Sequence, residues 1–134
     1  FPLRLSFTST DAEFKNTFSS SFWGDVSAGM AIPDLPETQL ALSAGFDTGN
    51  GWSGTATAYS FGGTCSVASC EAGNKVDSYN TLDLTLNREI SEKIDLYLTM
   101  TNLADNEDIV ARAPKNGARA QASRITLIGA RFKF

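Results

Sequence analysis

Hydrophobic and polar residues alternate along most of the chain, which is the pattern of β-strands whose two faces meet different surroundings. In the clearest segment, residues 82–87, three leucines alternate with Asp, Thr and Asn. Residues 94–100 repeat this alternation after a short polar segment at 88–93, so the two segments are predicted to form an antiparallel hairpin. We find no segment with the 3.6-residue period of an amphipathic helix. The sequence therefore predicts an all-β fold.

Four further segments show the same two-residue period. They are expected at Leu3 to Phe7 with an extension toward Phe14, from Pro36 to Phe46, at residues 52–61 and at residues 124–134. In the last of these, one face is predicted to carry residues 126, 128, 130, 132 and 134, while Arg131 and Lys133 point to the other face. About six strands are predicted in total.

The connections between the predicted strands alternate in length. They are long at 15–35, short at 47–51, long at 62–78, short at 88–93 and long at 102–123. Up-and-down barrels of outer membranes have tight periplasmic turns and long outer loops, whereas soluble sandwiches seldom keep this rhythm. The sequence predicts an antiparallel up-and-down transmembrane β-barrel segment. A soluble secreted β-sandwich that acts as a binding module stays open as the alternative.

Composition narrows the possible functions. The chain of 134 residues contains no histidine, so a histidine-based catalytic triad or metal site is excluded. Its net charge of -4 and its pI near 4.7 argue against nucleic-acid binding. We expect no cofactor, no metal site and no enzyme activity; an outer-membrane barrel enzyme would have to place its catalytic groups outside this segment. Without a starting Met or a signal-type segment, Phe1 is not expected to be a natural N-terminus.

Cys65 and Cys70 lie close together in a segment rich in Gly, Ser and Thr, with no other metal-ligating side chain beside them. A zinc site would need two more soft ligands, and a redox pair usually has two intervening residues. The spacing favours a small loop disulfide and hence an oxidising compartment; two free thiols are the alternative.

The chain resembles the C-terminal part of TonB-dependent receptors of the outer membrane. The resemblance is carried by the strand that opens at 77–84, by the Asn-Leu-Ala-Asp motif at 102–105, in which Ala104 replaces a usual Phe, and by the segment from Val110 to the terminal Phe134. The upstream segments 1–5, 22–26 and 32–40 are similar to the preceding strand, loop and Pro-x-x-Pro segment of that family. Residues 23–26 and 111–114 most resemble ferric-citrate-type and related siderophore receptors.

This resemblance implies that residues 1–134 are about the last six strands of a 22-stranded barrel, without the N-terminal plug and the earlier strands. It implies a share in active import of a ferric siderophore or similar metal chelate across the outer membrane of a Gram-negative bacterium. The implied partners are outer-membrane lipid, and the chelate and TonB through the full-length receptor. The barrel-assembly machinery is a further implied partner, because it would recognise the terminal Phe134 as an assembly signal.

Three basic residues of the last long connection are candidate ligand-binding residues. Arg112, Lys115 and Arg119 could bind an anionic ferric chelate, because guanidinium groups pair well with carboxylates. The alternative is a solvated loop in which the two arginines have a structural role.

Overall fold

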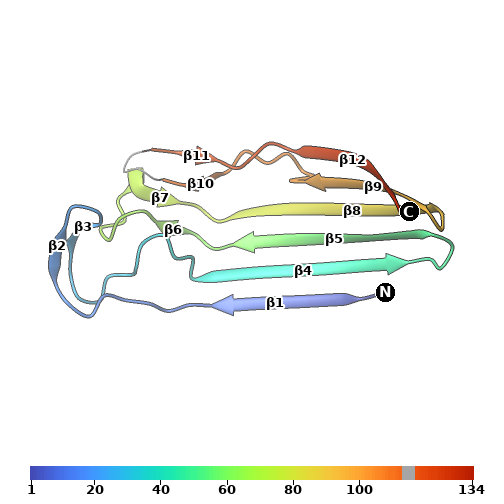
Figure 1. Cartoon of the computed structure of the whole chain (residues 1–134). Helices are drawn as coiled ribbons and strands as arrows, with labels where there is room; N and C mark the ends of the chain where they lie inside the picture. Colours follow the sequence, from blue (N-terminus) through green and yellow to red (C-terminus); the bar gives the residue numbers. More distant parts are fainter. Residues whose placement is uncertain (113–116) are drawn as a thin grey trace.

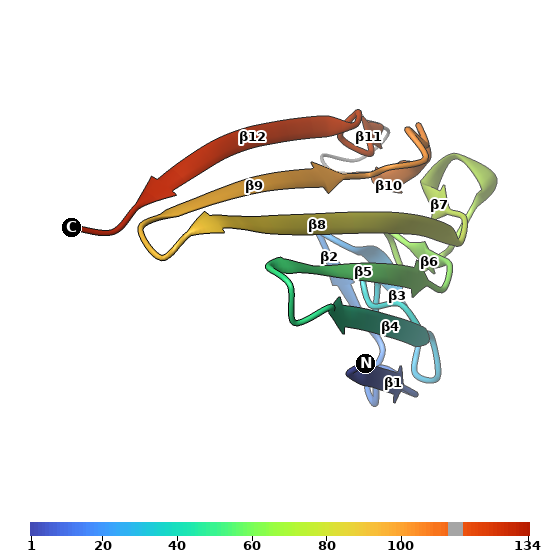
Figure 2. The same cartoon turned by 90° about the vertical axis from the view of Figure 1, so that its right-hand side faces the viewer.

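The structure of the chain is a computed structural model that describes residues 1–112 and 117–134. Its centre is one antiparallel sheet of six strands, each hydrogen-bonded to the next in the order β1-β4-β5-β8-β9-β12 (Figure 1). The strands are β1 (Leu3–Ser9), β4 (Thr38–Asp47), β5 (Trp52–Phe61), β8 (Tyr79–Ser91), β9 (Ile94–Thr101) and β12 (Ile125–Phe132). Figure 2 shows them following one another in a single twisted layer. The all-β, antiparallel prediction is confirmed, and the predicted hairpin is β8 and β9.

The strand register places apolar residues side by side on one face of this sheet. One transverse row, for example, joins Leu5, Leu42, Ala58 and Leu82 across four strands. We call this the apolar face, and its larger members are Leu3, Leu5, Phe7, Leu40, Leu42, Phe46, Trp52, Leu82, Leu84, Leu86, Ile90, Ile94, Leu96, Leu98, Met100, Ile128 and Phe132. The intervening residues, mostly Ser, Thr, Asn, Asp and Tyr, form the polar face. The register of β12 confirms the predicted faces at residues 126–132.

Two predicted strand boundaries were wrong. The first strand does not extend toward Phe14 but ends at Ser9, because the amide of Phe14 donates a hydrogen bond to the carbonyl of Met30 within the following loop (2.9 Å). The segment 88–93 is not a turn throughout: β8 continues to Ser91 with a bulge after Glu89, so the turn is short. Charged residues hid the continuation of β8 from the alternation pattern, whereas the first strand was predicted too long.

The long connections are loop 1 (residues 10–37), loop 2 (62–78) and loop 3 (102–124). They all lie at one end of the sheet, the loop end, whereas the tight turns and both chain termini lie at the other, the turn end (Figure 1). The predicted alternation of lengths is confirmed, but the small elements inside the loops were not predicted. These are β2 (Phe18–Ser20), β3 (Gly24–Val26), β6 (Thr64–Cys65), η1 (Ala72–Asn74), β7 (Lys75–Val76), β10 (Ile109–Ala111) and β11 (Arg119–Ala120).

Apolar side chains are buried in the loops rather than on the large sheet. Among the described residues, the buried hydrophobic side chains are Val26, Val67 and Val76, all in loops 1 and 2, whereas Leu5 is 66% exposed and Ile128 is 81% exposed. The described strands contain no second large sheet that covers the apolar face, so the β-sandwich alternative is wrong. No helix in the described part of the chain is long and apolar enough to cross a membrane.

Candidate functional site

The three loops are linked to one another by hydrogen bonds and form one connected layer at the loop end. The amide of Asp34 in loop 1 donates to the carbonyl of Cys65 in loop 2 over 2.8 Å. The guanidinium Nε of Arg112 in loop 3 donates to the carbonyl of Lys75 in loop 2 over 2.6 Å. Loop 2 therefore holds its two neighbours, and a ligand that approaches this end meets a structured surface.

Loop 2 contains two buried valines and a cross-link. Val76 is 1% exposed and Val67 is 4% exposed. A disulfide joins Cys65 to Cys70, whose Cα atoms lie 5.2 Å apart. The disulfide favoured by the cysteine spacing is present, and it removes conformational freedom from the unfolded form of this loop.

The structure places the predicted ligand-binding residues as follows. Arg112 follows β10, is partly buried, and uses its Nε for the bond to Lys75. Arg119 opens β11, is exposed, and pairs through its backbone with Ala111. Lys115 lies outside the described residues. Arg112 thus contacts loop 2, while Arg119 is exposed to solvent, and a role of these residues in ligand binding stays a prediction.

The Asn-Leu-Ala-Asp motif forms the junction between β9 and loop 3. Asn102 is buried and has a left-handed backbone with φ of 49°, which asparagine tolerates better than most residues. Its side-chain amide donates to the carbonyls of Asn106 (2.9 Å) and Ala122 (2.8 Å), and its side-chain oxygen accepts from the amide of Asn106 (3.1 Å). Its own amide donates to Asp83 Oδ1 over 3.1 Å. One buried side chain thus joins both ends of loop 3.

The last residue of the motif fixes the start of the final strand. Asp105 accepts a hydrogen bond from the amide of Arg124 at 2.7 Å, one residue before β12 begins. Leu103 donates through its amide to the carbonyl of Leu82 over 2.7 Å, so the motif also continues the pairing with β8. The motif that carried the resemblance therefore closes loop 3, and its Asn and Asp side chains make hydrogen bonds within this loop.

An aromatic cluster in loop 1 was not predicted. Phe14 lies 5.5 Å from Phe18 and 5.4 Å from Trp23, and Phe22 lies 5.6 Å from Trp23, measured between ring centroids. Phe22 is 72% exposed. Phe14, Phe18 and Phe22 are four residues apart, a spacing that fits a helix or one face of a strand, whereas the segment instead forms the short hairpin of β2 and β3. The cluster offers aromatic faces at the loop end.

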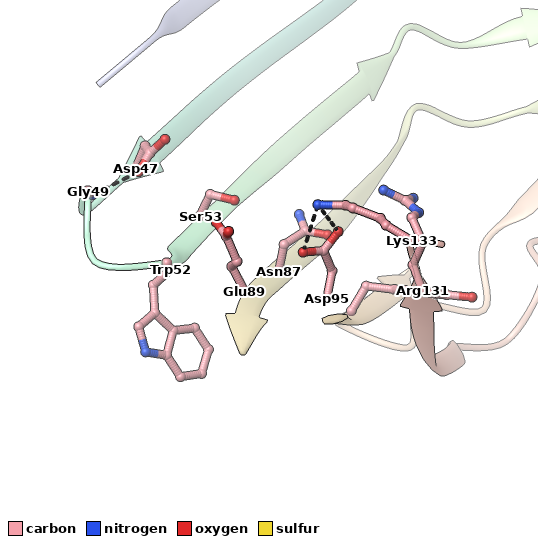
Figure 3. A pocket seen from close by; sticks show the side chains of 11 residues that line it. Asp47, Gly49, Trp52, Ser53, Asn87, Glu89, Asp95, Arg131 and Lys133 are labelled. Atoms are coloured by element: carbon pink, nitrogen blue, oxygen red, sulfur yellow. Dashed lines mark hydrogen bonds and ion pairs between the residues drawn. The ribbon is translucent and has the colours of Figure 1, made fainter. Parts of the chain in front are cut away.

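The turn end of the polar face carries a charged pocket of about 420 Å³ (Figure 3). Its wall contains the carboxylates of Asp47, Glu89 and Asp95 together with Arg131 and Lys133. The Lys133 amine lies 3.0 Å from Asp95 Oδ2, and in Figure 3 the Trp52 indole points away from this group. The pocket is open to its surroundings and lined by charged side chains, so it suits polar contacts better than acid/base chemistry.

Among the described residues, no group of three or more His, Cys, Asp and Glu side chains could hold a metal ion. The described arrangement offers a sheet with one apolar and one polar face, a loop layer with exposed aromatic and basic side chains, and a charged pocket on the polar face.

The fold was compared with known proteins. The siderophore receptor PiuA from Acinetobacter baumannii superimposes with a TM-score of 0.85 at 18% identity, over 98% of this chain and 19% of that chain. The sheet has the fold of part of a siderophore-receptor barrel. The closed form of the ferric-catecholate import receptor Fiu from E. coli K12 gives a TM-score of 0.73 at 20% identity, again over 98% of this chain and 19% of that one. Its open form gives 0.64 at 21% identity over 76% of this chain and 16% of that one.

The chain thus spans about a fifth of the length of the receptors whose barrel fold it shares. No family model matches the sequence, and no curated protein matches it. The predicted barrel fold is confirmed. The ferric-citrate subgroup stays a prediction.

Proposed function

We propose that this chain is part of an outer-membrane, TonB-dependent transporter that imports a ferric siderophore or a similar metal chelate. The observation that carries the proposal is the whole-length match of a two-faced sheet, loops included, to the siderophore receptor PiuA. In this proposal the apolar face meets lipid, the polar face meets the hydrated interior of the barrel, and the loop end faces outward.

Within such a receptor the chain would be the C-terminal part of the barrel, preceded by the plug and the earlier strands. The match to about a fifth of each receptor supports a partial barrel. The loop-closing motif centred on Asn102 supports the C-terminal position, because it belongs to the resemblance described above. The edges of β1 and β12 need further strands, since an open sheet edge is not stable in lipid. Phe134 would serve as the assembly signal.

The ligand would meet the loop layer first. Arg119 is exposed there, and Arg112 keeps guanidinium N–H groups besides the Nε that binds Lys75. With Lys115, these residues would attract an anionic chelate, since guanidinium groups bind carboxylates through paired hydrogen bonds. The aromatic cluster of Phe22 and its neighbours would add contact area for an aromatic chelating group. This segment would then contribute wall and outer loops but no catalytic step.

Uptake of radioactive iron by cells tests the function directly. In a strain that lacks other siderophore receptors, the receptor containing this chain should support uptake of a ferric siderophore that depends on TonB. Replacement of Arg112, Lys115 and Arg119 together by glutamine should weaken uptake at low chelate concentration more than at saturation. Correctly inserted receptor that imports none of a panel of ferric catecholates, hydroxamates and citrate would contradict the proposal.

The orientation is tested separately with single cysteines at two exposed acidic positions. Asp77→Cys in loop 2 should react with a membrane-impermeant maleimide in intact cells, whereas Glu92→Cys in the β8–β9 turn should react only after the outer membrane is permeabilised. The native cysteines give little background because they form a disulfide. Labelling of Glu92→Cys in intact cells would contradict the proposed orientation.

A further inference from the structure

One charged residue interrupts the apolar face near the turn end. Within the six described strands, Arg88 is the charged residue that the register places among the leucines of this face. It lies opposite Trp52 on β5 and Leu96 on β9. A guanidinium group that faces hydrocarbon is costly, so it must lie near the membrane boundary and have a partner.

Two contacts hold this guanidinium at the turn end of the sheet. Its central carbon lies 5.1 Å from the centroid of the Trp52 ring, and its Nη1 donates to the carbonyl of Asn50 in the β4–β5 turn over 2.8 Å. Both contacts leave Nε and Nη2 available, and among the described residues no carboxylate lies within ion-pair distance of Arg88. The charge is positioned but not neutralised.

An apolar groove runs along the same face from the Arg88 side chain. It has a volume of about 470 Å³, and its apolar wall is formed by Trp52, Leu86, Ile90, Leu96, Leu98 and Ile128. The groove therefore combines one cationic group at the turn end with an open and mostly apolar wall. A molecule that matches both parts has an anionic head and an apolar chain.

We propose that this groove binds an anionic phospholipid of the inner leaflet, with its phosphate at Arg88 and an acyl chain along the leucine wall. The inference rests on the proposed membrane orientation, in which the turn end faces the phospholipid leaflet. Charge complementarity selects the occupant: the guanidinium pairs with phosphate oxygens through its free N–H groups, and the wall offers contacts to hydrocarbon alone. The lipid thereby neutralises the charge that the protein leaves unpaired.

The test uses the receptor containing this chain, purified in detergent and titrated with phosphatidylglycerol or phosphatidylcholine, with bound lipid counted by native mass spectrometry. Wild type should retain phosphatidylglycerol at least about fivefold better than phosphatidylcholine, a difference of about 1 kcal/mol. Arg88→Gln should abolish this preference, and Arg88→Lys should keep part of it, because lysine retains the charge but loses the planar stack on Trp52. Lys93→Gln is the matched control, since it removes one positive charge at the same end but outside the groove.

A loss of preference confined to the Arg88 variants supports the site. If Arg88→Gln and Lys93→Gln lose the preference for phosphatidylglycerol equally, anionic lipid is attracted to this end in general and the proposed site is overturned. The site is also overturned if Arg88→Gln retains phosphatidylglycerol as well as the wild type does. If Arg88→Gln fails to fold, Trp52→Leu removes the stack and one groove wall, and it should also reduce the preference. A receptor that inserts and imports iron without preferring phosphatidylglycerol refutes this inference alone, whereas failure to insert refutes the proposed function as well.

Discussion

The two faces of the sheet are built from the same strands but have opposite chemistry. On β8, Leu84 lies between Ala56 and Met100 on the neighbouring strands, while the next residue, Thr85, lies between Thr55 and Thr99. A soluble protein would cover the leucines with a second layer, yet in the described chain the buried valines lie in the loops. The described chain thus leaves these leucines uncovered, and in the proposed barrel they would be buried against hydrocarbon while the other face meets water or other protein.

The largest expected effect comes from placing the same charge on each face at mid-sheet. Leu84→Arg should destabilise the folded receptor in the membrane by about 2–4 kcal/mol, because arginine at the bilayer centre is poorly solvated. Thr85→Arg should cost much less, since its side chain points to the polar face. The measurement is the fraction of receptor in the outer membrane that resists heat-dissociation on a gel and external protease.

The two variants control each other, because they add the same residue at adjacent positions of one strand. Equal losses of folded receptor would mean that both faces are water-exposed or both are covered by protein. Either outcome would remove the distinction between a lipid face and a lumen face.

A smaller difference between the faces arises at two glycines that lie beside aromatic rings. A Cβ at Gly54 would lie 2.7 Å from the Phe46 ring on the apolar face and 2.8 Å from the backbone oxygen of Thr85. The three heavy atoms nearest to a Cβ at Gly129, on the polar face, belong to the outer part of the Tyr97 side chain, which can rotate away. Gly54→Ala should therefore cost about 1–3 kcal/mol of unfolding free energy, and Gly129→Ala less.

Removing the ring distinguishes these cases in thermal unfolding of the purified receptor. The effect of Gly129→Ala should shrink in a Tyr97→Ala background, because the three heavy atoms nearest to the new Cβ all belong to the Tyr97 side chain. The effect of Gly54→Ala should persist in a Phe46→Ala background, since the Thr85 backbone cannot move without breaking the sheet. Full rescue of Gly54→Ala by Phe46→Ala would show that the ring alone limits the space there.

The sheet was predictable from the sequence because its two-residue period is imposed by its two environments. That period located all six strands, the turn at 47–51 and both faces of β12, where Arg131 and Ile128 point in opposite directions. Boundaries failed where local interactions override the period, as at Glu89, where a bulge shifts the register before the strand continues.

The loop layer could not be predicted in the same way. Its order comes from contacts between segments far apart in sequence, such as Asp34 with Cys65 and Arg112 with Lys75. The aromatic rings of Phe14 and Trp23 meet only because a short hairpin reverses the chain between them. The basic residues could be named as candidates from their charge, but the engagement of Arg112 by a backbone carbonyl has no sequence signal.

The smallest expected effect concerns the ion pair between Lys133 and Asp95 on the polar face. Its nitrogen and oxygen lie 3.0 Å apart, with side-chain exposures of 51% and 19%. Exposed pairs of this kind contribute below about 1 kcal/mol and are screened by salt, so Lys133→Gln should barely change the unfolding temperature, and less at high salt than at low salt. A double-mutant cycle with Asp95→Asn measures the coupling. A coupling of several kcal/mol that persists at high salt would mean that this end of the polar face is shielded from water in the complete receptor. The polar face would then be covered by protein there, and the two faces would differ in what covers them rather than in exposure to water.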